Sequence, residues 1–574
     1  MSVRRGNPWW LLALLPAIAA CIIRAPYYLV VMGTIGIDAI AAVGLAITLR
    51  KAGQPSLAQT TFMAIGAYTA SLLELNAHWP LLAAGIAGVA AAALAAWIIG
   101  AILLNLEGLY FALGTLALNA AAVAIFRNTG VFGNDAGLQD LSPLRIPGLS
   151  SDQAPTVVAW VLAALGLSIA VRLDRSRFGR GLRMLRESVK VTQSVGFDPA
   201  SLKRSAFTLS GAYAGVAGVL LTAQLSVVNP SLFSLGNSIA LLAMVITGGE
   251  ALLGTIGGAI VIVVVHELSR SWLQYAPVTL AGGIDLLVNG LVLILILRFW
   301  PRGLASLGAL IPRRKRVAPA PGSVLPEWPA PLQTRSGAGV PVLRARDVGH
   351  RFGGVYAVDG ASLAVVPGEI VAVIGPNGAG KTTLLSVIAG YHAIQRGEVD
   401  LDGTPIDDLP PFRRARRGVA ATFQHMEVVQ QMSVWENVLA AARHADRVEG
   451  ALAAVHLLEM AERPVSDLSF GQQRMVELAR VLARDETPRV LLMDEPASGL
   501  SQPERAVLAG VIRRFASAGT AVVLVEHDVA FVARIADNIL VLDHGVPIAE
   551  GPPQTLLREQ VVIDAYLGSA AVQA

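Results

Sequence analysis

Long apolar runs fill the first 300 residues of the chain, and shorter runs recur through the rest. A membrane-spanning helix needs about 20 mostly apolar residues, with a range of about 17 to 25. Several runs reach this length, so the pattern predicts an all-α polytopic membrane domain with about ten apolar segments. Two of the runs are short or polar, which favours broken or re-entrant helices; these lie near 57–73 and 235–248. The other runs lie near 8–23, 27–49, 80–104, 108–126, 154–172, 206–226, 252–269 and 280–299.

Beyond residue 342 the pattern changes to short apolar strands between helical and polar stretches. Strands are predicted at 369–374, 490–493 and 521–525, and a helix over 381–389. Strands that alternate with helices are typical of an α/β domain. The charged residues follow the same division, because residues 1–300 hold 30 of the 86 charged side chains.

The segment between the two halves is rich in proline and contains the basic run Arg313 to Arg316. Basic clusters bind anionic headgroups at the cytoplasmic leaflet, and proline-rich chain favours an extended tether. We therefore expect a membrane domain over 1–310, a linker over 311–342 and an α/β domain over 343–574.

Lysine and arginine placement predicts which side of the membrane each loop faces. Nine basic residues stand against three acidic ones between Arg172 and Arg204, and further basic clusters lie at 50–51 and from 298 onward. Ten crossings from a cytoplasmic N-terminus put all of these clusters inside. The protein is therefore expected in the cell (inner) membrane as a multi-pass protein, with its α/β domain in the cytoplasm.

The membrane half contains an ionisable residue in an apolar run, Asp38, that is a candidate for a specific role, and one cysteine, Cys21. Asp38 is the best-buried ionisable candidate, and helix pairing and contact with a solute are both open roles for it. Cys21 is the single cysteine, which excludes an intrachain disulfide. The start of the chain imitates a bacterial lipoprotein signal, but more apolar runs follow, so we interpret it as a first membrane helix.

Residues 375–383 read Gly-Pro-Asn-Gly-Ala-Gly-Lys-Thr-Thr, between a predicted strand and a predicted helix. They fit the pattern G-x-x-x-x-G-K-[ST], whose glycines let backbone N–H groups curl around phosphates. Lys381 would reach the terminal phosphates, and Thr382 would supply a hydroxyl to Mg²⁺. A glycine-rich turn in an unrelated α/β domain is the alternative. The predicted nucleotide contacts are Gly375, Pro376, Asn377, Gly378, Ala379, Gly380, Lys381, Thr382 and Thr383.

Two further strands end in side chains that suit phosphate chemistry. Asp494 and Glu495 follow the strand at 490–493. Asp494 could hold the metal directly or through water, and Glu495 is placed to orient or activate the attacking water. His527 follows the strand at 521–525 and could contact the terminal phosphate.

With these features in place, residues 343–574 resemble the ATPase subunit of ABC transporters. Leu468-Ser469-Phe470-Gly471-Gln472 matches the family signature. The resemblance implies ATP and Mg²⁺ as cofactors and ATP hydrolysis as the activity. It implies Phe352 as the aromatic residue that stacks on adenine. It also implies that Ser469, Gly471 and Gln472 close over a nucleotide held by a second ATPase subunit.

The catalytic set implied by the resemblance has three members, Glu495, His527 and Gln424. Gln424 matches the family's glutamine that senses the metal and faces the membrane partner, so the implied metal contacts are Thr382, Gln424 and Asp494.

Two positions depart from the family pattern. Ser501 stands where many relatives carry Asp or Asn, which puts the coupling contact across the ATPase pair in doubt. Gln424 and Ser469 are only 45 positions apart, which implies a shortened helical subdomain.

The membrane half resembles the permease of branched-chain amino acid importers, and the end of the α/β half, at Val562 to Gly568, resembles the ATPases of the same group. Gln59-Thr60-Thr61 departs from the permease pattern, since a Gly-His-Ala-like run is common there, beside the presumed substrate path. The matching permease motifs are Ala52 to Leu57, Gly66 to Thr69, Gly108 to Phe111, Arg175 to Arg180 and Trp300 to Leu304.

Together the two resemblances imply a fused permease–ATPase of a binding-protein-dependent importer. Branched-chain or related amino acids are the expected solutes, with urea, amides, aromatic acids and sugars as alternatives. An ABC exporter and a non-transporting ABC ATPase are the rival classes.

The importer reading also implies partners. These are a second permease and a second ATPase subunit (sister subunits or another fusion), an extracytoplasmic solute-binding protein and the lipid bilayer, and no nucleic acid. Within the basic loop, 187–196 is expected to form a short helix that docks beside Gln424. The alternative is a loop that only sets topology by its charge.

Overall fold

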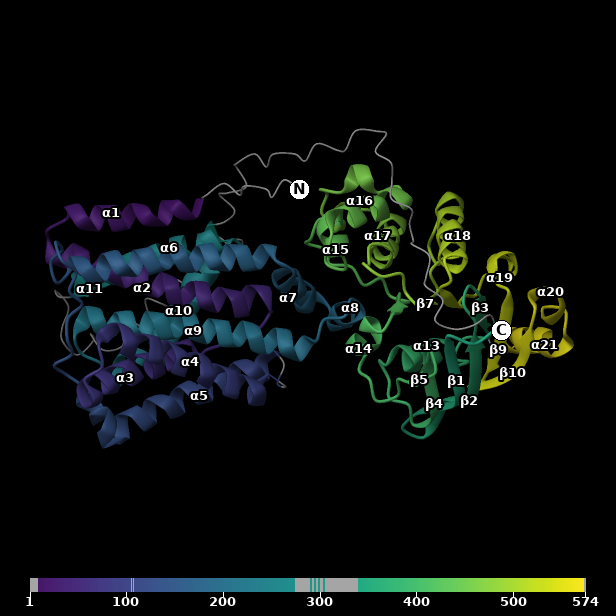
Figure 1. Ribbon diagram of the computed structural model, residues 1–574, viewed down its shortest axis with the longest axis horizontal. Coiled ribbons are helices and arrows are strands. Elements are labelled where there is room, and N and C mark those ends of the chain that lie inside the picture. The colour runs from purple at the N-terminus through teal and green to yellow at the C-terminus, as the bar shows by residue number, and fades with distance from the viewer. Residues whose placement is uncertain are drawn as a thin grey trace. The chain divides into compact units, whose positions relative to one another are not determined.

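The computed structural model describes residues 9–104, 106, 108–273 and 339–571, with a few short pieces between 290 and 304 (Figure 1). The chain divides into two compact units, one of residues 1–186 and 200–313 and the other of residues 187–199 and 314–574. Most of the predicted linker and of the apolar run near 280–299, with the Trp300 to Leu304 motif beside it, lie outside the described residues.

The first unit is built of helices that lie side by side (Figure 1). In chain order they are η1 (Trp9–Leu14), α1 (Leu15–Ile22), α2 (Pro26–Ala46), the π-helical η2 (Ile47–Lys51), α3 (Gln59–Ala77), α4 (Leu81–Leu103), α5 (Gly108–Asn128), η3 (Gly130–Phe132), η4 (Asn134–Ala136), α6 (Gln153–Arg175), α7 (Arg177–Glu187), α9 (Pro199–Leu225), η5 (Pro230–Phe233), α10 (Leu235–Gly248) and α11 (Leu252–Leu273).

Six helices among the described residues are long and apolar enough to cross a membrane. They are α2 with η2, α4, α5, α6, α9 and the Leu252–Ser269 part of α11. Three more of the expected segments form the shorter helices η1 with α1 and α10, and the more polar helix α3. The expected helical, apolar domain is confirmed, and the count of about ten segments is approximate.

Small residues bring the backbones of these helices into close contact. Gly66 of α3 faces Gly215 of α9, and a Cβ added to Gly66 would lie 2.7 Å from the Gly215 Cα. Close approach of this kind stabilises helix pairs in lipid, where no hydrophobic force draws helices together. The run near 57–73 is not broken, because α3 is a continuous helix of 19 residues.

The second unit is an α/β fold with two sheets. One sheet has the strand order β2-β1-β4-β5, and the other has the order β10-β9-β3-β8-β7-β6, parallel from β9 to β6. The strands are β1 (Leu343–Phe352), β2 (Val355–Val365), β3 (Ile370–Ile374), β4 (Arg396–Leu401), β5 (Thr404–Pro405), β6 (Val419–Ala421), β7 (Val490–Asp494), β8 (Ala521–Val525), β9 (Asn538–Asp543) and β10 (Val546–Gly551).

The helices of this unit cover the six-stranded sheet and form a separate group between β6 and β7. They are α8 (Val189–Ser194), α13 (Lys381–Ala389), α14 (Pro411–Arg416), α15 (Val434–Leu439), α16 (Ala445–Ala454), η8 (Leu458–Met460), η9 (Val465–Asp467), α17 (Phe470–Leu482), α18 (Gln502–Ser517), α19 (Val529–Ile535), α20 (Pro553–Leu556) and α21 (Gln560–Ala571). The predicted strands and the predicted helix over 381–389 are confirmed as β3, β7, β8 and α13.

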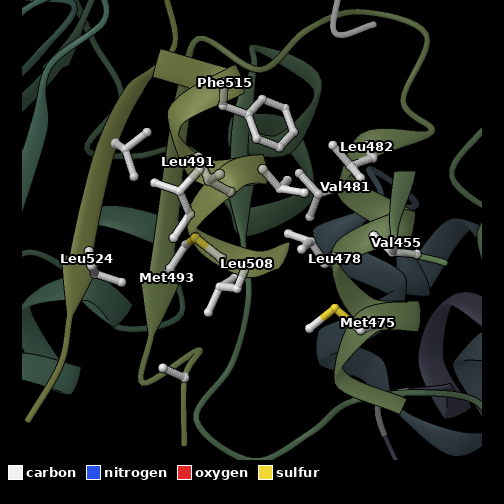
Figure 2. Packing of buried hydrophobic residues seen from close by; sticks show 14 of the residues in the cluster. Val455, Met475, Leu478, Val481, Leu482, Leu491, Met493, Leu508, Phe515 and Leu524 are labelled. Carbon is white, nitrogen blue, oxygen red and sulfur yellow. The ribbon is translucent and has the colours of Figure 1, made fainter. Parts of the chain in front are cut away.

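A continuous apolar core joins the central strands to the helices. Strands β3, β7 and β8 are buried at every position, as expected for parallel strands covered on both faces. Figure 2 shows Met475 and Leu478 of α17 facing Leu491 and Met493 of β7 across this core. The core therefore fixes α17 against the strand that ends in Asp494.

Candidate functional site

The carboxyl ends of three neighbouring parallel strands bring the predicted site residues to one edge of the sheet. Strand β8 lies between β3 and β7. Residues 375–380 follow β3, Asp494 and Glu495 lie at the end of β7, and His527 comes shortly after β8. Ligands of open α/β sheets bind at this edge.

The loop at 375–380 curls between β3 and α13. Gly375 has a φ of +151°, and a Cβ there would collide with the carbonyl oxygen of Leu542, so only glycine fits. The Lys381 ammonium lies inside the curl and donates to the carbonyl oxygens of Gly375 and Pro376, both at 2.8 Å. Burial lowers the pKa of Lys381, against the pull of Glu495 and Asp494.

The start of α13 adds to this cradle. Its N-cap is Gly380, which has no side chain that could accept hydrogen bonds from the amides of the first turn. Amides of this kind favour anions. Lys381 and these amides together fit a chain of phosphates.

Asp494 and Thr382 place two possible metal ligands, a carboxylate and a hydroxyl, next to each other. The Thr382 hydroxyl donates to Asp494 Oδ1 at 3.2 Å. Asp494 is buried, and this burial raises the pKa of its carboxyl, with the Thr382 hydrogen bond acting in the opposite direction. A hydroxyl beside a carboxylate offers the kind of oxygen ligands that Mg²⁺ binds.

Glu495 is the point where the other predicted catalytic residues meet. The Gln424 amide Nε2 donates to Glu495 Oε1 at 3.1 Å, and His527 Nε2 makes a short contact with the same oxygen. The structure thus brings Gln424 and His527 to one carboxylate oxygen.

The backbone of Glu495 is in the left-handed region, with a φ of +45°. For a residue other than glycine this conformation costs about 1–3 kcal/mol, and surrounding contacts must hold it in place. The Glu495 amide donates to the Val525 carbonyl at 2.9 Å, and Arg474 donates to the Glu495 carbonyl at 3.2 Å.

Arg474 and Glu477, which sequence reasoning missed, hold this arrangement from α17. Arg474 donates to the carbonyl oxygens of Phe423 (2.6 Å) and Gln424 (3.1 Å), and Glu477 accepts from the Phe423 amide at 3.3 Å. The two side chains also pair with each other at 2.8 Å, at 3% and 1% exposure. Their i, i+3 spacing is the available signal in the sequence, but it does not distinguish a buried pair from a surface one.

Glu526 is a third residue that the sequence did not single out. It is buried, which raises the pKa of its carboxyl, and it accepts from the amides of Ala497 at 2.7 Å and His527 at 3.3 Å. It therefore ties the segment after Glu495 to the segment that carries His527.

The signature residues lie at the start of α17. Ser469 is the N-cap and forms a capping box with Gln472, through bonds of 3.3 Å and 3.1 Å. A Cβ at Gly471 would collide with the carboxylate of Glu504, so a larger residue here would require the Glu504 side chain to move. Glu504 in turn forms a capping box with Ser501, the N-cap of α18.

Phe352 lies at the end of β1 with 51% of its surface exposed. Its ring packs edge-on against His350 and His392, with centroid distances of 4.7 Å and 5.2 Å. An exposed aromatic face is what stacking on a base requires. Burial lowers the pKa of His392.

Residues 187–196, which include α8, contact the chain on both sides of Gln424. Arg416 donates to the Gly196 carbonyl at 2.7 Å, and Tyr391 donates to the Lys190 carbonyl at 3.2 Å. Glu187 accepts from the Gln430 amide at 2.8 Å. Ser194 and Val195 line a small recess together with Ala421, which is three residues before Gln424.

Two family models match the chain. Residues 27–297 match the family described as "Branched-chain amino acid transport system / permease component", and residues 358–498 match the family described as "ABC transporter".

Curated relatives match the α/β half. The chain is 37% identical over 254 residues to the high-affinity branched-chain amino acid transport ATP-binding protein BraF of Pseudomonas aeruginosa. This match covers 40% of this chain and 99% of the relative. It is 36% identical to LivG of Escherichia coli, described in the same words, with the same coverage. It is also 37% identical over 236 residues to the hemin import ATP-binding protein HmuV of Rhodopseudomonas palustris, covering 39% of this chain and 87% of the relative.

Proposed function

Because the chain belongs to the ABC transporter family and joins a permease domain to an ATP-hydrolysing domain, we propose that it imports branched-chain or related amino acids. It is a membrane protein with a cytoplasmic ATPase domain. The match that carries the proposal is that of the permease half, over residues 27–297. The ATPase half alone does not identify the solute, since its relatives include both amino acid and hemin importers.

Within the ATPase half, Glu495 is proposed as the residue that orients and deprotonates the attacking water. Its oxygen Oε1 is held by Gln424 and His527, which keeps the carboxylate in one direction. His527 would also contact the terminal phosphate, and Gln424 would sense the metal. Positioning and electrostatic stabilisation supply most of the catalysis in phosphoryl transfer.

Thr382 and Asp494 are proposed to hold Mg²⁺, with Gln424 as a third contact. Mg²⁺ neutralises charge on the phosphates when it is bound. Lys381 and the amides of 375–383 would hold the phosphates, and Phe352 would stack on adenine. The cradle, the oxygen donors and the exposed ring support this assignment.

Partners follow from the family. We propose that Ser469, Gly471 and Gln472 face a nucleotide on a second ATPase subunit, so that one chain supplies half of each site. A second permease subunit and an extracytoplasmic solute-binding protein complete the importer. The contacts of residues 187–196 with the segment around Gln424 support a role for this stretch in coupling the two halves.

Competition between solutes tests the choice of substrate. Membrane vesicles that hold this chain with its partner subunits and binding protein would be given labelled L-leucine and ATP. Unlabelled L-isoleucine and L-valine should compete, whereas urea, benzoate and glucose should not. Uptake of labelled urea or benzoate in preference to L-leucine would overturn the amino acid assignment.

A further inference from the structure

A cluster of uncharged polar side chains lies inside the helical unit, where the starts of two helices meet. Thr60 and Thr61 are in the first turn of α3, Ser238 is in the first turn of α10, and Asn119 is in the middle of α5. Each of the four is at most 2% exposed. Polar groups inside a membrane domain are costly unless they are hydrogen-bonded.

One group of this cluster has no partner. Thr60 Oγ1 lies 2.5 Å from Ser238 Oγ, and Asn119 Nδ2 donates to Thr60 Oγ1 at 2.8 Å. The same Nδ2 lies 3.2 Å from Thr61 Oγ1 and 3.3 Å from the Phe233 carbonyl. The buried Asn119 Oδ1, in contrast, accepts no hydrogen bond from the described part of the chain. A buried amide oxygen without a donor has lost its water and gained nothing in return, which is unfavourable.

The two helix starts supply the opposite polarity. The N-cap of α3 is Ala58 and that of α10 is Ser234, and neither side chain accepts a hydrogen bond from the first turn. Uncapped first-turn amides carry a partial positive charge and favour an anion. Helix starts inside the membrane domain bind anionic solute groups in other transporter folds.

An aromatic group adjoins the polar cluster through Phe233. The Phe233 carbonyl lies near Asn119, and its ring lies 6.2 Å from the ring of Tyr68. Tyr68 stacks on Phe126 at 4.6 Å and meets Phe132 edge-on at 5.3 Å. The buried region thus has a polar end and an aromatic end, in which the Tyr68 hydroxyl is also buried without a hydrogen bond from the described part of the chain.

We propose that Thr60, Thr61, Asn119 and Ser238, with the starts of α3 and α10, form a recognition site for a small zwitterion with an apolar side chain. The solute carboxylate binds the first-turn amides, and its ammonium donates to Asn119 Oδ1. Its side chain lies against Tyr68, Phe126 and Phe233. Since the four side chains now bond to one another, the solute would replace the Thr60–Ser238 bond.

Helix pairing by polar side chains is the competing explanation. It accounts for the bonds that are made, but not for an amide oxygen that is left without a donor. None of the four cluster residues is ionisable, so a zwitterion, which is neutral overall, suits the site better than a net cation or anion. This inference rests on the proposed import function and names the solute class and its contacts.

Saturation-transfer NMR on the full-length chain in lipid nanodiscs, without a binding protein, tests the site. The probes are L-leucine, 4-methylpentanoate, which lacks the ammonium, and 3-methylbutylamine, which lacks the carboxylate. The wild type should prefer L-leucine to either analogue by about tenfold or more, because each analogue leaves one end of the site unpaired. Asn119→Leu should reduce the preference over 4-methylpentanoate to about twofold or less.

Four further variants separate recognition from folding. Thr60→Val and Ser238→Ala should each weaken L-leucine binding, and Thr60→Ser should restore it. Ser71→Ala is the matched control, because the buried Ser71 hydroxyl donates only to the Ala67 carbonyl of its own helix at 2.9 Å. An unchanged preference in Asn119→Leu, no transfer to L-leucine in the wild type, or an equal loss in Ser71→Ala would overturn the site. Normal L-leucine uptake alongside such a result would leave the import function intact.

Discussion

Arg474 donates to the backbone carbonyl oxygens of both Gln424 and Glu495, so one buried side chain holds both of these residues. Arg474→Met should destabilise the ATPase half by about 3–5 kcal/mol, since Glu477 would become an unpaired buried charge. Urea denaturation measures this loss.

A double variant separates the charge from the positioning role. Arg474→Met with Glu477→Leu should recover only part of the stability, because the buried carboxylate is gone but the buried Arg480 loses its main opposite charge. Its ATPase rate should stay low, since Gln424 and Glu495 still lack their donor. Full recovery of the rate would show that Arg474 serves stability alone.

Asp494 makes the nucleotide-free protein sensitive to pH. Its folded-state pKa is raised by burial, so the ionised form is destabilising above that pKa. This destabilisation disappears as the pH falls through the folded-state pKa towards the unfolded value of about 4. Asp494→Asn should therefore raise the melting temperature at pH 7 by about 2 °C or more, and less at low pH. Thermal unfolding at several pH values measures it, and an equal gain at all pH values would contradict the argument.

At the scale of elements, the strands that carry the site were predictable because parallel strands covered on both faces are apolar throughout, as β3, β7 and β8 are. The unbroken helix α3 was not expected, because its polar first turn resembles an interruption. In the fold, that turn is buried against Asn119 and Ser238. The burial of Arg474 and Glu477 likewise depends on the packing of α17, which no local pattern encodes.

Ser501 has a structural role at the start of α18. It forms a capping box with Glu504, whose carboxylate accepts from the Ser501 amide at 2.8 Å and from the Ser501 hydroxyl at 2.7 Å. Ser501→Ala should cost about 1 kcal/mol of stability, whereas Ser501→Thr, which keeps the hydroxyl, should change it by only a few tenths. Chemical denaturation of the two variants measures the difference. Equal losses would mean that the cap does not stabilise the helix.

Helix α8 offers a test of coupling with a control one residue away. Arg416 donates to the Gly196 carbonyl, whereas Arg417 donates to Pro405. Arg416→Ala should lower solute uptake several-fold while the basal ATPase rate is kept, because the segment 187–196 that contains α8 loses a contact but the site at Glu495 does not. Arg417→Ala should leave both unchanged. Equal effects of the two variants on uptake would contradict a coupling role for α8.

At the scale of the whole molecule, the sequence predicted a helical membrane half and an α/β half, and the family matches confirm both. Residues 187–199 group with the α/β unit although they fall within the first half of the chain. A domain boundary drawn at residue 310 from hydropathy does not separate these residues from the first unit. Hydropathy reports the composition of each stretch of chain, and not which stretches contact one another. The expected short helix in this segment is present as α8.

The central claim is that ATP hydrolysis at Glu495 drives solute uptake. Its most direct test is ATP-driven uptake of L-leucine into vesicles that hold the whole importer, with Glu495→Gln in this chain. The variant should still bind ATP, because the cradle of Lys381 and its loop is intact, but uptake should fall at least about 100-fold. Uptake at the wild-type rate would contradict the account.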